Sequence, residues 1–262
     1  MSSAARGPGR AGPPTQAGIY DYLLGGHHHT PADRDAAEKA LITAPEARVM
    51  ARQNRAFAQR AVCYMAERGV RQYIDLGSGF PTVGAVHEIA GRFVPRPHVL
   101  YVDYDLMAAT FGRAMVSSYP NVAVIACDLR NPWDVIDAPG TARLIDWSQP
   151  VAVLMAAVLH SVRDEDDPRD IVTTFRDHMA PGSYLVVSHM SPGENPGSAE
   201  AAARAWDGTR PAARLRMPAE VDGWFVGFDM VGPGLVTTTE WGTTKPAPSG
   251  QAVMLAGVGR VP

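Results

Sequence analysis

The sequence predicts an α/β fold: a doubly wound, mostly parallel seven-stranded sheet with a reversed last strand and an N-terminal helical lid. Three observations support this prediction. From Gln72 onward, short β-branched strands alternate with segments of helical length, as in a parallel sheet covered on both faces. Two glycines follow the first strand in Asp75-Leu76-Gly77-Ser78-Gly79, which suits a sharp turn at a strand end. The last segments resemble a hairpin, which reverses one strand.

The N-terminal region divides into a lead-in and a lid. Residues 1–18 are predicted to be disordered, because Gly, Pro, Ser and Ala bury little apolar surface. The domain is predicted to span residues 19–262. The aromatic run Tyr20–Gly26 ends in two glycines, which could act as a hinge for a closing lid. Two helices are predicted next, over Thr30–Ile42 and Pro45–Arg68, with Gly69 as the stop of the second.

Proline and glycine mark several boundaries in the remaining chain, since Pro150 precedes one strand and Pro181-Gly182 turns the chain into the next. Strands are predicted at Gln72–Leu76, His98–Val102, Val122–Cys127, Val151–Met155, Ser183–Ser188, Phe228–Val231 and Ala252–Val258. Helices are predicted at Val83–Ala90, Leu106–Ser117, Trp133–Ile136, Pro168–Met179, Ala199–Trp206 and Ala219–Val226.

Composition restricts the class of protein. The 262 residues are 46% hydrophobic, enough for one sizeable core. A formal charge of -3 gives no global attraction for nucleic acid or an anionic membrane. No stretch approaches the ~18 apolar residues of a membrane span, and no signal-peptide core is present. Cys63 and Cys127 fit reduced core thiols. We expect a cytoplasmic protein without nucleic-acid or membrane partners.

Three successive predicted strands end in a carboxylate, at Asp75, Asp103 and Asp128. Carboxylates accept hydrogen bonds from ribose hydroxyls and an exocyclic amine, whereas they repel phosphoryl oxygens. A pyrophosphate-binding turn would need a third glycine where Phe80-Pro81-Thr82 stand. The pattern therefore favours a nucleoside ligand. Alternatively, Asp103 caps loop amides, Asp128 forms an Asx-type turn, and the glycine turn holds no ligand.

Several motifs occur in a fixed order, and they resemble class I S-adenosylmethionine-dependent methyltransferases. More specifically, the region from Ile19 to Val261 resembles an actinobacterial S-adenosyl methyltransferase family, formerly a domain of unknown function. Such proteins usually carry Arg and Lys where this chain has Gly18 and His27. The motifs that carry the resemblance are Tyr20–Gly26, Ala32–Arg34, Asp75–Gly79, Val102–Asp105, Ala126–Arg130, Leu159-His160 before Asp166–Pro168, and Pro181–His189.

The resemblance implies S-adenosylmethionine as the cofactor, and it gives the matching residues roles. Asp103 would accept both ribose hydroxyls. Tyr104 and Leu129 would bracket the adenine ring, and Asp128 would accept the adenine amine proton. The methionine end of the cofactor is assigned to Asp75, Gly77, Ser78, Gly79 and Ala156, with a hydroxyl from Tyr20 or Tyr22 of the lid.

Two histidine sites need separate interpretation. His160 follows the fourth strand and is a candidate general base, because imidazole titrates near neutral pH. The resemblance suggests equally that a histidine here packs structurally, and methyl transfer needs alignment more than a base. His27-His28-His29 lacks further ligands at metal-binding spacing. No metal is therefore predicted, and this run is expected to form a solvent-facing loop or a lid contact.

The sequence thus favours methyl transfer from S-adenosylmethionine to a small-molecule acceptor, with a role in secondary metabolism. Two alternatives remain open. One is a regulatory or partner-binding protein that holds the cofactor without transferring the methyl group. The other is an enzyme that uses the same cofactor for a different reaction. The sequence predicts neither the acceptor nor the oligomeric state.

Overall fold

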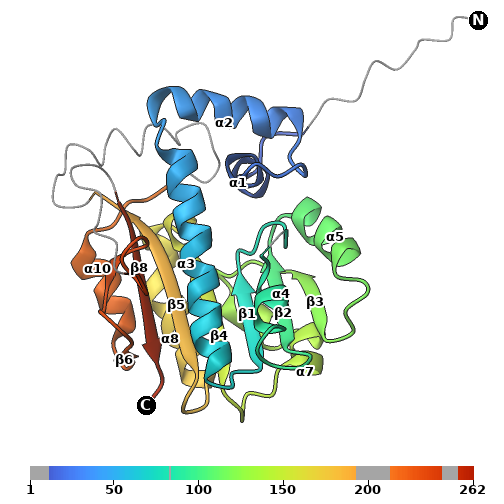
Figure 1. Cartoon of the computed structure of the whole chain (residues 1–262), viewed down its shortest axis with the longest axis vertical. Helices are drawn as coiled ribbons and strands as arrows, with labels where there is room; N and C mark the ends of the chain where they lie inside the picture. The colour runs from blue at the N-terminus through green and yellow to red at the C-terminus, as the bar shows by residue number, and fades with distance from the viewer. Residues whose placement is uncertain (1–11, 83, 193–212, 244–252) are drawn as a thin grey trace, which may run out of the picture.

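The computed structural model describes residues 12–82, 84–192, 213–243 and 253–262. An eight-stranded sheet lies at the centre of this part of the chain, in the order β3-β2-β1-β4-β5-β8-β6, with β7 paired to β8. Figure 1 shows the sheet with helices around it. The strands are β1 Gln72–Leu76, β2 His98–Asp103, β3 Val122–Ala126, β4 Val151–Ala156, β5 Tyr184–Ser191, β6 Asp229–Met230, β7 Val236–Thr237 and β8 Val253–Arg260.

The strand directions confirm the predicted sheet. Strands β1 to β5 pair in parallel, and β8 pairs with β5 in the opposite direction. Seven strands form the main path, and the eighth is the two-residue β7, which was not predicted. The predicted strand Phe228–Val231 is shorter, because only Asp229–Met230 pairs with β8. Residue 252, the predicted start of the last strand, lies outside the described residues.

The helices follow the predicted order, with differences at their ends. The predicted lead-in is too long, because α1 begins at Gln16 and is capped by the Thr15 side chain. Helix α7 was missed, since its Pro139-Gly140 start resembles a loop. The predicted helix Ala199–Trp206 lies outside the described residues. The helices are α1 Gln16–Leu24, α2 Pro31–Thr43, α3 Ala47–Glu67, α4 Val86–Ala90, α5 Leu106–Met115, α6 Pro132–Ile136, α7 Pro139–Leu144, α8 Pro168–His178 and α10 Pro218–Asp222.

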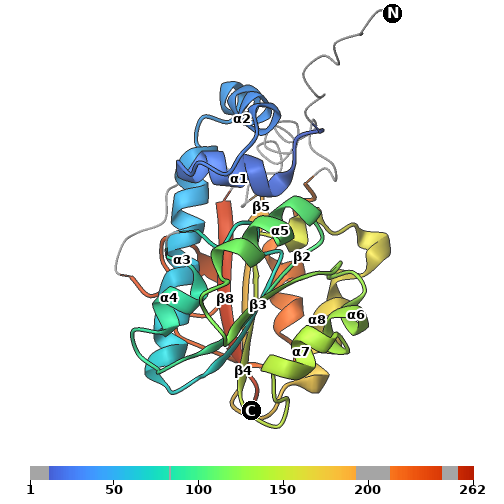
Figure 2. The same cartoon turned by 90° about the vertical axis from the view of Figure 1, so that its right-hand side faces the viewer.

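Alternate residues of each strand point into two separate cores. Tyr73 of β1 packs with Phe57 of α3 and Ile89 of α4, and neighbouring Ile74 packs with Ile136 of α6 and Phe175 of α8. Figure 2 shows α3 and α4 on one side of the sheet and α6, α7 and α8 on the other. Both faces of the sheet are therefore buried, which explains strands that are apolar along their whole length.

A third, smaller core joins the N-terminal helices to one another. Ile19 and Leu23 of α1 pack against Ala37 of α2 and against Ala47 and Ala51 of α3. Helix α2 begins with a capping box between Thr30 and Asp33, which fixes its start. Figure 1 shows α1 and α2 above the ends of the strands, beside the first turns of α3. The two predicted N-terminal helices are therefore present, and the aromatic run, for which no helix was predicted, forms α1; we call α1, α2 and the first turns of α3 the helical cap.

Candidate functional site

A cavity lies between the carboxyl ends of β1, β2 and β4 and the helices α1 and α3. Most of the sequence-predicted site residues share its wall, although they come from four separate parts of the chain. Tyr22, Asp128 and Leu129 do not line it. The predicted residues on the wall are Tyr20, Asp75, Gly77, Ser78, Gly79, Asp103, Tyr104, Ala156 and His160.

The glycine turn after β1 is fixed by backbone contacts. The amides of Gly77 and Ser78 both donate to the Val102 carbonyl, at 2.8 and 3.1 Å. Gly77 and Gly79 have φ of 67° and 59°, in the left-handed region that favours glycine. A Cβ on Gly77 would lie 2.2 Å from Val158 Cγ2, whereas one on Gly79 would meet nothing closer than Ala17, at 3.8 Å. Gly77 is thus required by packing as well as by conformation.

Asp103 stabilises this turn from the end of β2. Its Oδ2 accepts the Gly79 amide at 2.8 Å, and its Oδ1 accepts the Asp105 amide at 2.9 Å. The residue is only 6% exposed, and this burial raises the pKa of the carboxyl although the two amides oppose the shift. Asp103 is therefore a strand-end cap. Each oxygen keeps a second lone pair, so the carboxylate can also accept hydroxyls from a ligand.

Asp75 faces the cavity with its hydrogen-bonding capacity unused. Within the described residues its carboxylate has no hydrogen-bond partner, and burial raises its pKa to about 7. The Arg55 guanidinium opposes that shift, whereas the Asp103 charge adds to it. Arg55 lines the same cavity, and its guanidinium carbon lies 5.7 Å from the Tyr20 ring centre. This pair of opposite charges complements a zwitterionic amino acid.

Arg55 was not identified from the sequence. It lies in α3 among other arginines, and Arg52 one turn earlier is exposed to solvent. Nothing in the local pattern separates the two side chains, because both fit the polar positions of an amphipathic helix. Only the placement of α3 against β1 shows which arginine reaches the cavity.

A chain of buried hydrogen bonds connects the cap to the loop after β4. The Tyr20 hydroxyl donates to the Ala51 carbonyl at 3.1 Å and accepts from Asn54 Nδ2 at 2.9 Å. Asn54 Oδ1 accepts from the Ser188 hydroxyl, which in turn accepts the Ala157 amide at 2.9 Å. Ala157 has a φ of 56°, which is unusual for a residue with a side chain. These hydrogen bonds thus hold α1 and the strained Ala157 on the wall of one cavity.

Tyr22 and the turn after α1 lie outside the cavity wall. The Tyr22 hydroxyl donates to Glu38 Oε1 of α2 at 3.0 Å, so the predicted cofactor contact is not supported for Tyr22. The buried Asp21 carboxylate accepts the amides of His28 and His29, at 2.8 and 3.1 Å. A Cβ on Gly26 would lie 2.0 Å from Asp21 Oδ1. The Gly25-Gly26 pair is therefore a packed turn in this structure, not a loose hinge.

Position 18 lies outside the cavity as well. A Cβ on Gly18 would lie 2.2 Å from Asp33 Oδ2, in the capping box of α2. A longer side chain there would meet Asp33 first. Where the family usually has Arg, this chain has Gly18, and this difference therefore affects the contact between α1 and α2. Within the described residues, the cation on the cavity wall is Arg55.

Asp128 forms the Asx-type turn that was the alternative interpretation. Its Oδ1 accepts the Arg130 amide at 3.0 Å, and the Arg130 side chain binds both oxygens. Burial would raise the pKa of this carboxyl, but the contacts with Arg130 outweigh it and lower the pKa. Leu129 is 8% exposed and packs in the core on the α6 face. Contacts from these two residues to adenine remain a prediction.

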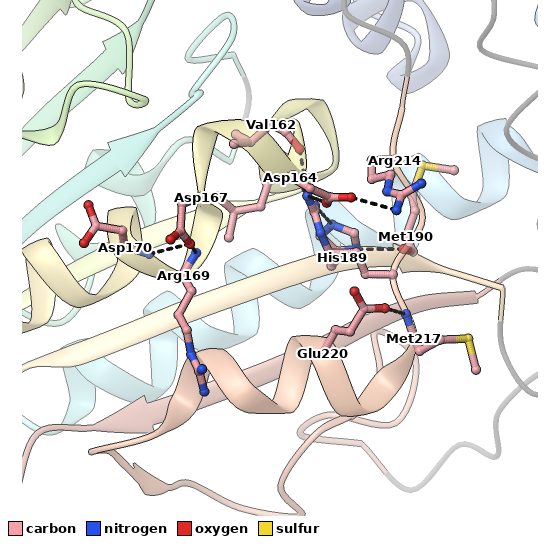
Figure 3. Close-up of polar contacts among 12 residues, drawn as sticks. Val162, Asp164, Asp167, Arg169, Asp170, His189, Met190, Arg214, Met217 and Glu220 are labelled. Carbon is pink, nitrogen blue, oxygen red and sulfur yellow. Dashed lines mark hydrogen bonds and ion pairs between the residues drawn. The ribbon is translucent and has the colours of Figure 1, made fainter.

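The loop after β4 is held by a buried arginine from the other end of the chain. Arg216 is 3% exposed, and it donates to the Leu159 and Val162 carbonyls at 3.0 and 2.9 Å. It also binds His189 Nε2 at 3.1 Å and Asp164 Oδ1 at 2.7 Å. Figure 3 shows these contacts around Asp164 and His189. Since Nε2 of His189 accepts from Arg216, its Nδ1 carries the proton that Met190 O accepts at 2.7 Å.

His160 lies on this loop and borders the cavity. Its Nδ1 is buried without a hydrogen-bond partner among the described residues. Burial, and then the Arg216 charge, lower the pKa of His160 to about 4. The imidazole is therefore neutral at physiological pH. It is a weak base but a good partner for a polar group of a bound molecule.

Comparisons with known proteins agree with this geometry. The model of the S-adenosyl methyltransferase family matches residues 10–262. A candidate methyltransferase of Thermobifida fusca is 35% identical, with 95% of each chain covered and a TM-score of 0.89. A DUF574 family protein of Streptomyces avermitilis is 34% identical, with 95% of this chain and 98% of that one covered and a TM-score of 0.88.

A more distant structure shares only the fold. The N-methyltransferase NodS of Bradyrhizobium japonicum, in complex with S-adenosylhomocysteine, is 13% identical over 78% of this chain and 86% of its own, with a TM-score of 0.51. A search among curated proteins finds no match. In the described ranges, no helix is long and apolar enough to cross a membrane. The same ranges hold no cluster of three or more His, Cys, Asp or Glu side chains that could bind a metal.

Proposed function

This chain belongs to the S-adenosyl methyltransferase family, and from that premise we propose that it methylates a small molecule held in the cavity. The observation that carries the proposal is the composition of one cavity wall. This wall carries unused carboxylate capacity at Asp75 and Asp103, and it also carries the neutral His160. Under this proposal the enzyme acts in the cytoplasm, on an intermediate of secondary metabolism.

The polar groups and glycines of the wall suit the chemistry of the cofactor. Asp103 has lone pairs left for the ribose hydroxyls, and the half-exposed Tyr104 ring offers a face to adenine, with Asp128 and Leu129 on the far side. The left-handed glycines leave room for a close approach of the ligand to the backbone. Asp75 and Arg55 would take the amino and carboxylate groups of the methionine part. When bound, the cofactor supplies a methyl group made electrophilic by the adjacent sulfonium.

The chain's own residues contribute orientation and exclusion of water. The small Ala156 and Ala157 allow the acceptor to approach the end of β4 closely. Tyr20, fixed by Asn54, covers the cavity from α1 and keeps water out. His160 orients the polar group that is to be methylated, since its low pKa leaves it neutral. Alignment of the attacking atom in a dry site supplies most of the acceleration in such a reaction.

Cofactor binding is tested by calorimetry with S-adenosylhomocysteine. The wild type is expected to bind it, and Arg55→Gln is expected to weaken binding by about tenfold, the loss of one charge-assisted contact. Arg52→Gln is the matched control, because that arginine is exposed on the same helix. No binding by the wild type would overturn the proposal. Equal affinity in the two variants would show that Arg55 does not contact the cofactor.

Transfer itself is tested by the release of S-adenosylhomocysteine from S-adenosylmethionine. If the protein transfers the methyl group, release depends on the added acceptor and a methylated product of equal amount appears. Release without a methylated product would indicate a different use of the cofactor. Binding without any release across a broad acceptor panel would favour the regulatory alternative.

A further inference from the structure

Away from β1 and β2, the cavity wall continues along β5 and β8, where apolar side chains line it, and we call this region its second end. Leu23 of α1 and Met50 of α3 come from the helical cap, and Met190 of β5 and Met254 of β8 come from the sheet. Met190 and Met254 are register partners on antiparallel strands, so both side chains lie on the same sheet face. Three methionines from elements far apart in the sequence thus surround one space.

The charged side chains on the described part of the cavity wall lie at the strand ends and near the start of α3. Of the charged side chains on the cavity wall in the described ranges, Asp75, Asp103 and Asp105 belong to the strand ends, and Arg55 acts on Asp75. Glu46 lies at the start of α3, one turn before Met50. Among the described residues, Glu46 is therefore the acid beside the methionine-lined space. Burying a charged ligand among these side chains would cost free energy without a partner to repay it.

Methionine is suited to hold a flat ring. Its thioether is polarisable and its side chain is unbranched, so it adapts to the edge and face of an aromatic group. Leucine or isoleucine would give a similarly apolar wall with a fixed shape. The presence of methionine on the helical side and on two strands favours an aromatic ligand over a compact aliphatic one.

A polar group borders the same space. His160 lines the cavity on the loop after β4, and the buried Arg216 fixes that loop. The imidazole ring stands at 77° to that of His189, with 5.9 Å between centres, which sets its orientation. Among the described residues neither ring nitrogen of His160 has a hydrogen-bond partner. A hydroxyl on an aromatic ligand would meet this group.

We propose, on the basis of the methyl transfer proposed above, that this end is the acceptor site and takes an uncharged aromatic molecule whose hydroxyl lies against His160. The hydroxyl oxygen attacks the methyl carbon, so an O–C bond forms while the C–S bond breaks. Sulfur keeps the bonding electrons and becomes a neutral thioether. The hydroxyl proton is released to water while the neutral His160 orients the hydroxyl, and the product is an aryl methyl ether.

The test uses 2-naphthol as the probe, with cyclohexanol, 2-naphthoate and tryptamine as comparison molecules. The expected result is an O-methyl product from 2-naphthol, with kcat/KM at least about tenfold above that of each comparison molecule. Met50→Gln keeps the size of the side chain but makes it polar. It is expected to raise KM for 2-naphthol about fivefold and to leave S-adenosylhomocysteine affinity unchanged. Met217→Gln is the control, since Met217 is exposed outside the cavity.

Each other outcome overturns the proposal. A preference for cyclohexanol would show an aliphatic site, and a preference for tryptamine would show that Glu46 selects a cation. If 2-naphthol is neither methylated nor bound in calorimetry with S-adenosylhomocysteine present, the site does not take aromatic alcohols. Equal KM values in Met50→Gln and the wild type would remove the methionine wall from the site. In these cases S-adenosylhomocysteine still binds, whereas its failure to bind would overturn the proposed function instead.

Discussion

The two ends of the cavity are built from different parts of the protein. The strand-end side consists of the backbone turns and carboxylates at the carboxyl ends of β1 and β2, within some thirty residues of one another. The methionine-lined side gathers Leu23, Met50, Met190 and Met254 from both ends of the chain. One end is thus a local feature of the sheet, and the other exists only after the cap and β8 are in place.

This difference predicts that the two ends of the cavity tolerate substitution unequally. A turn that depends on φ and on a close backbone approach tolerates few residues. A wall of side chains on a helix and two strands tolerates exchange, because volume-conserving apolar substitutions cost little stability. The following predictions test this contrast, from the largest expected effect to the smallest.

Gly77→Ala is expected to be the most damaging substitution at the strand-end side. The new Cβ would collide with Val158, and φ is already left-handed, so we expect a loss of at least about 3 kcal/mol in the free energy of unfolding. Gly79→Ala shares the unfavourable φ but has open space, and should lose only about 1–2 kcal/mol. Urea denaturation measures both. Similar losses would show that conformation alone matters at this turn.

Arg216→Met should affect the other side nearly as strongly. It leaves the Val162 carbonyl without its donor and removes one of the two donors to the Leu159 carbonyl, so we expect a loss of about 2–3 kcal/mol in unfolding free energy. Methyl transfer should fall more than S-adenosylhomocysteine affinity, because the loop with His160 loses its anchor. Arg214→Met is the control, since within the described residues the Arg214 side chain contacts only the exposed Asp164. Unchanged transfer in folded Arg216→Met would contradict this positioning role.

Asp103→Ala should weaken S-adenosylhomocysteine binding by about tenfold or more, from the loss of contacts worth about 1.5–3 kcal/mol. Asp103→Asn can still accept one loop amide, so this variant distinguishes the role of Asp103 in holding the loop from its contact with the ribose. Calorimetry on both variants is the measurement. If the affinity stays at the wild-type value in either variant, the ribose contact is absent.

Cofactor affinity should depend on pH through Asp75. Its pKa of about 7 means that the carboxyl of the free protein is protonated below that pH, so affinity should rise about tenfold from pH 6 to pH 8. Because the folded pKa exceeds the unfolded value, the free protein should also lose stability as pH rises from about 4 to about 7. Asp75→Asn should remove both dependences. A pH-independent affinity in the wild type would contradict the role of this group.

His160→Gln should have the smallest effect, a fall in methyl transfer of less than about tenfold with unchanged cofactor affinity. Its folded pKa of about 4 lies below the unfolded value, so His160 contributes stability that is lost as pH falls from about 6.5 towards 4. The variant should therefore unfold less readily than the wild type over that range, relative to their stabilities at pH 8. A loss of transfer by several orders of magnitude would show that His160 is an essential base.

The sequence predicted the sheet and the strand-end side well, because both depend on short local patterns. Asp75, Gly77 and Gly79 form one continuous motif, and their positions follow from a single strand and turn. Arg55 and Met254 carry no such local signal, since each reaches the cavity through tertiary packing. Tyr22 shows the opposite error: it belongs to a recognisable motif, yet its side chain turns towards α2.

The position of β8 has a consequence for the order of synthesis. This strand is translated after all the others, yet it lies between β5 and β6, and all eight residues of β5 are buried. Until β8 emerges from the ribosome, the backbone edge of β5 has no partner, and an unpaired strand edge promotes pairing with other chains. Met254 also arrives with β8. A nascent chain thus carries the glycine turn long before the methionine-lined space is closed.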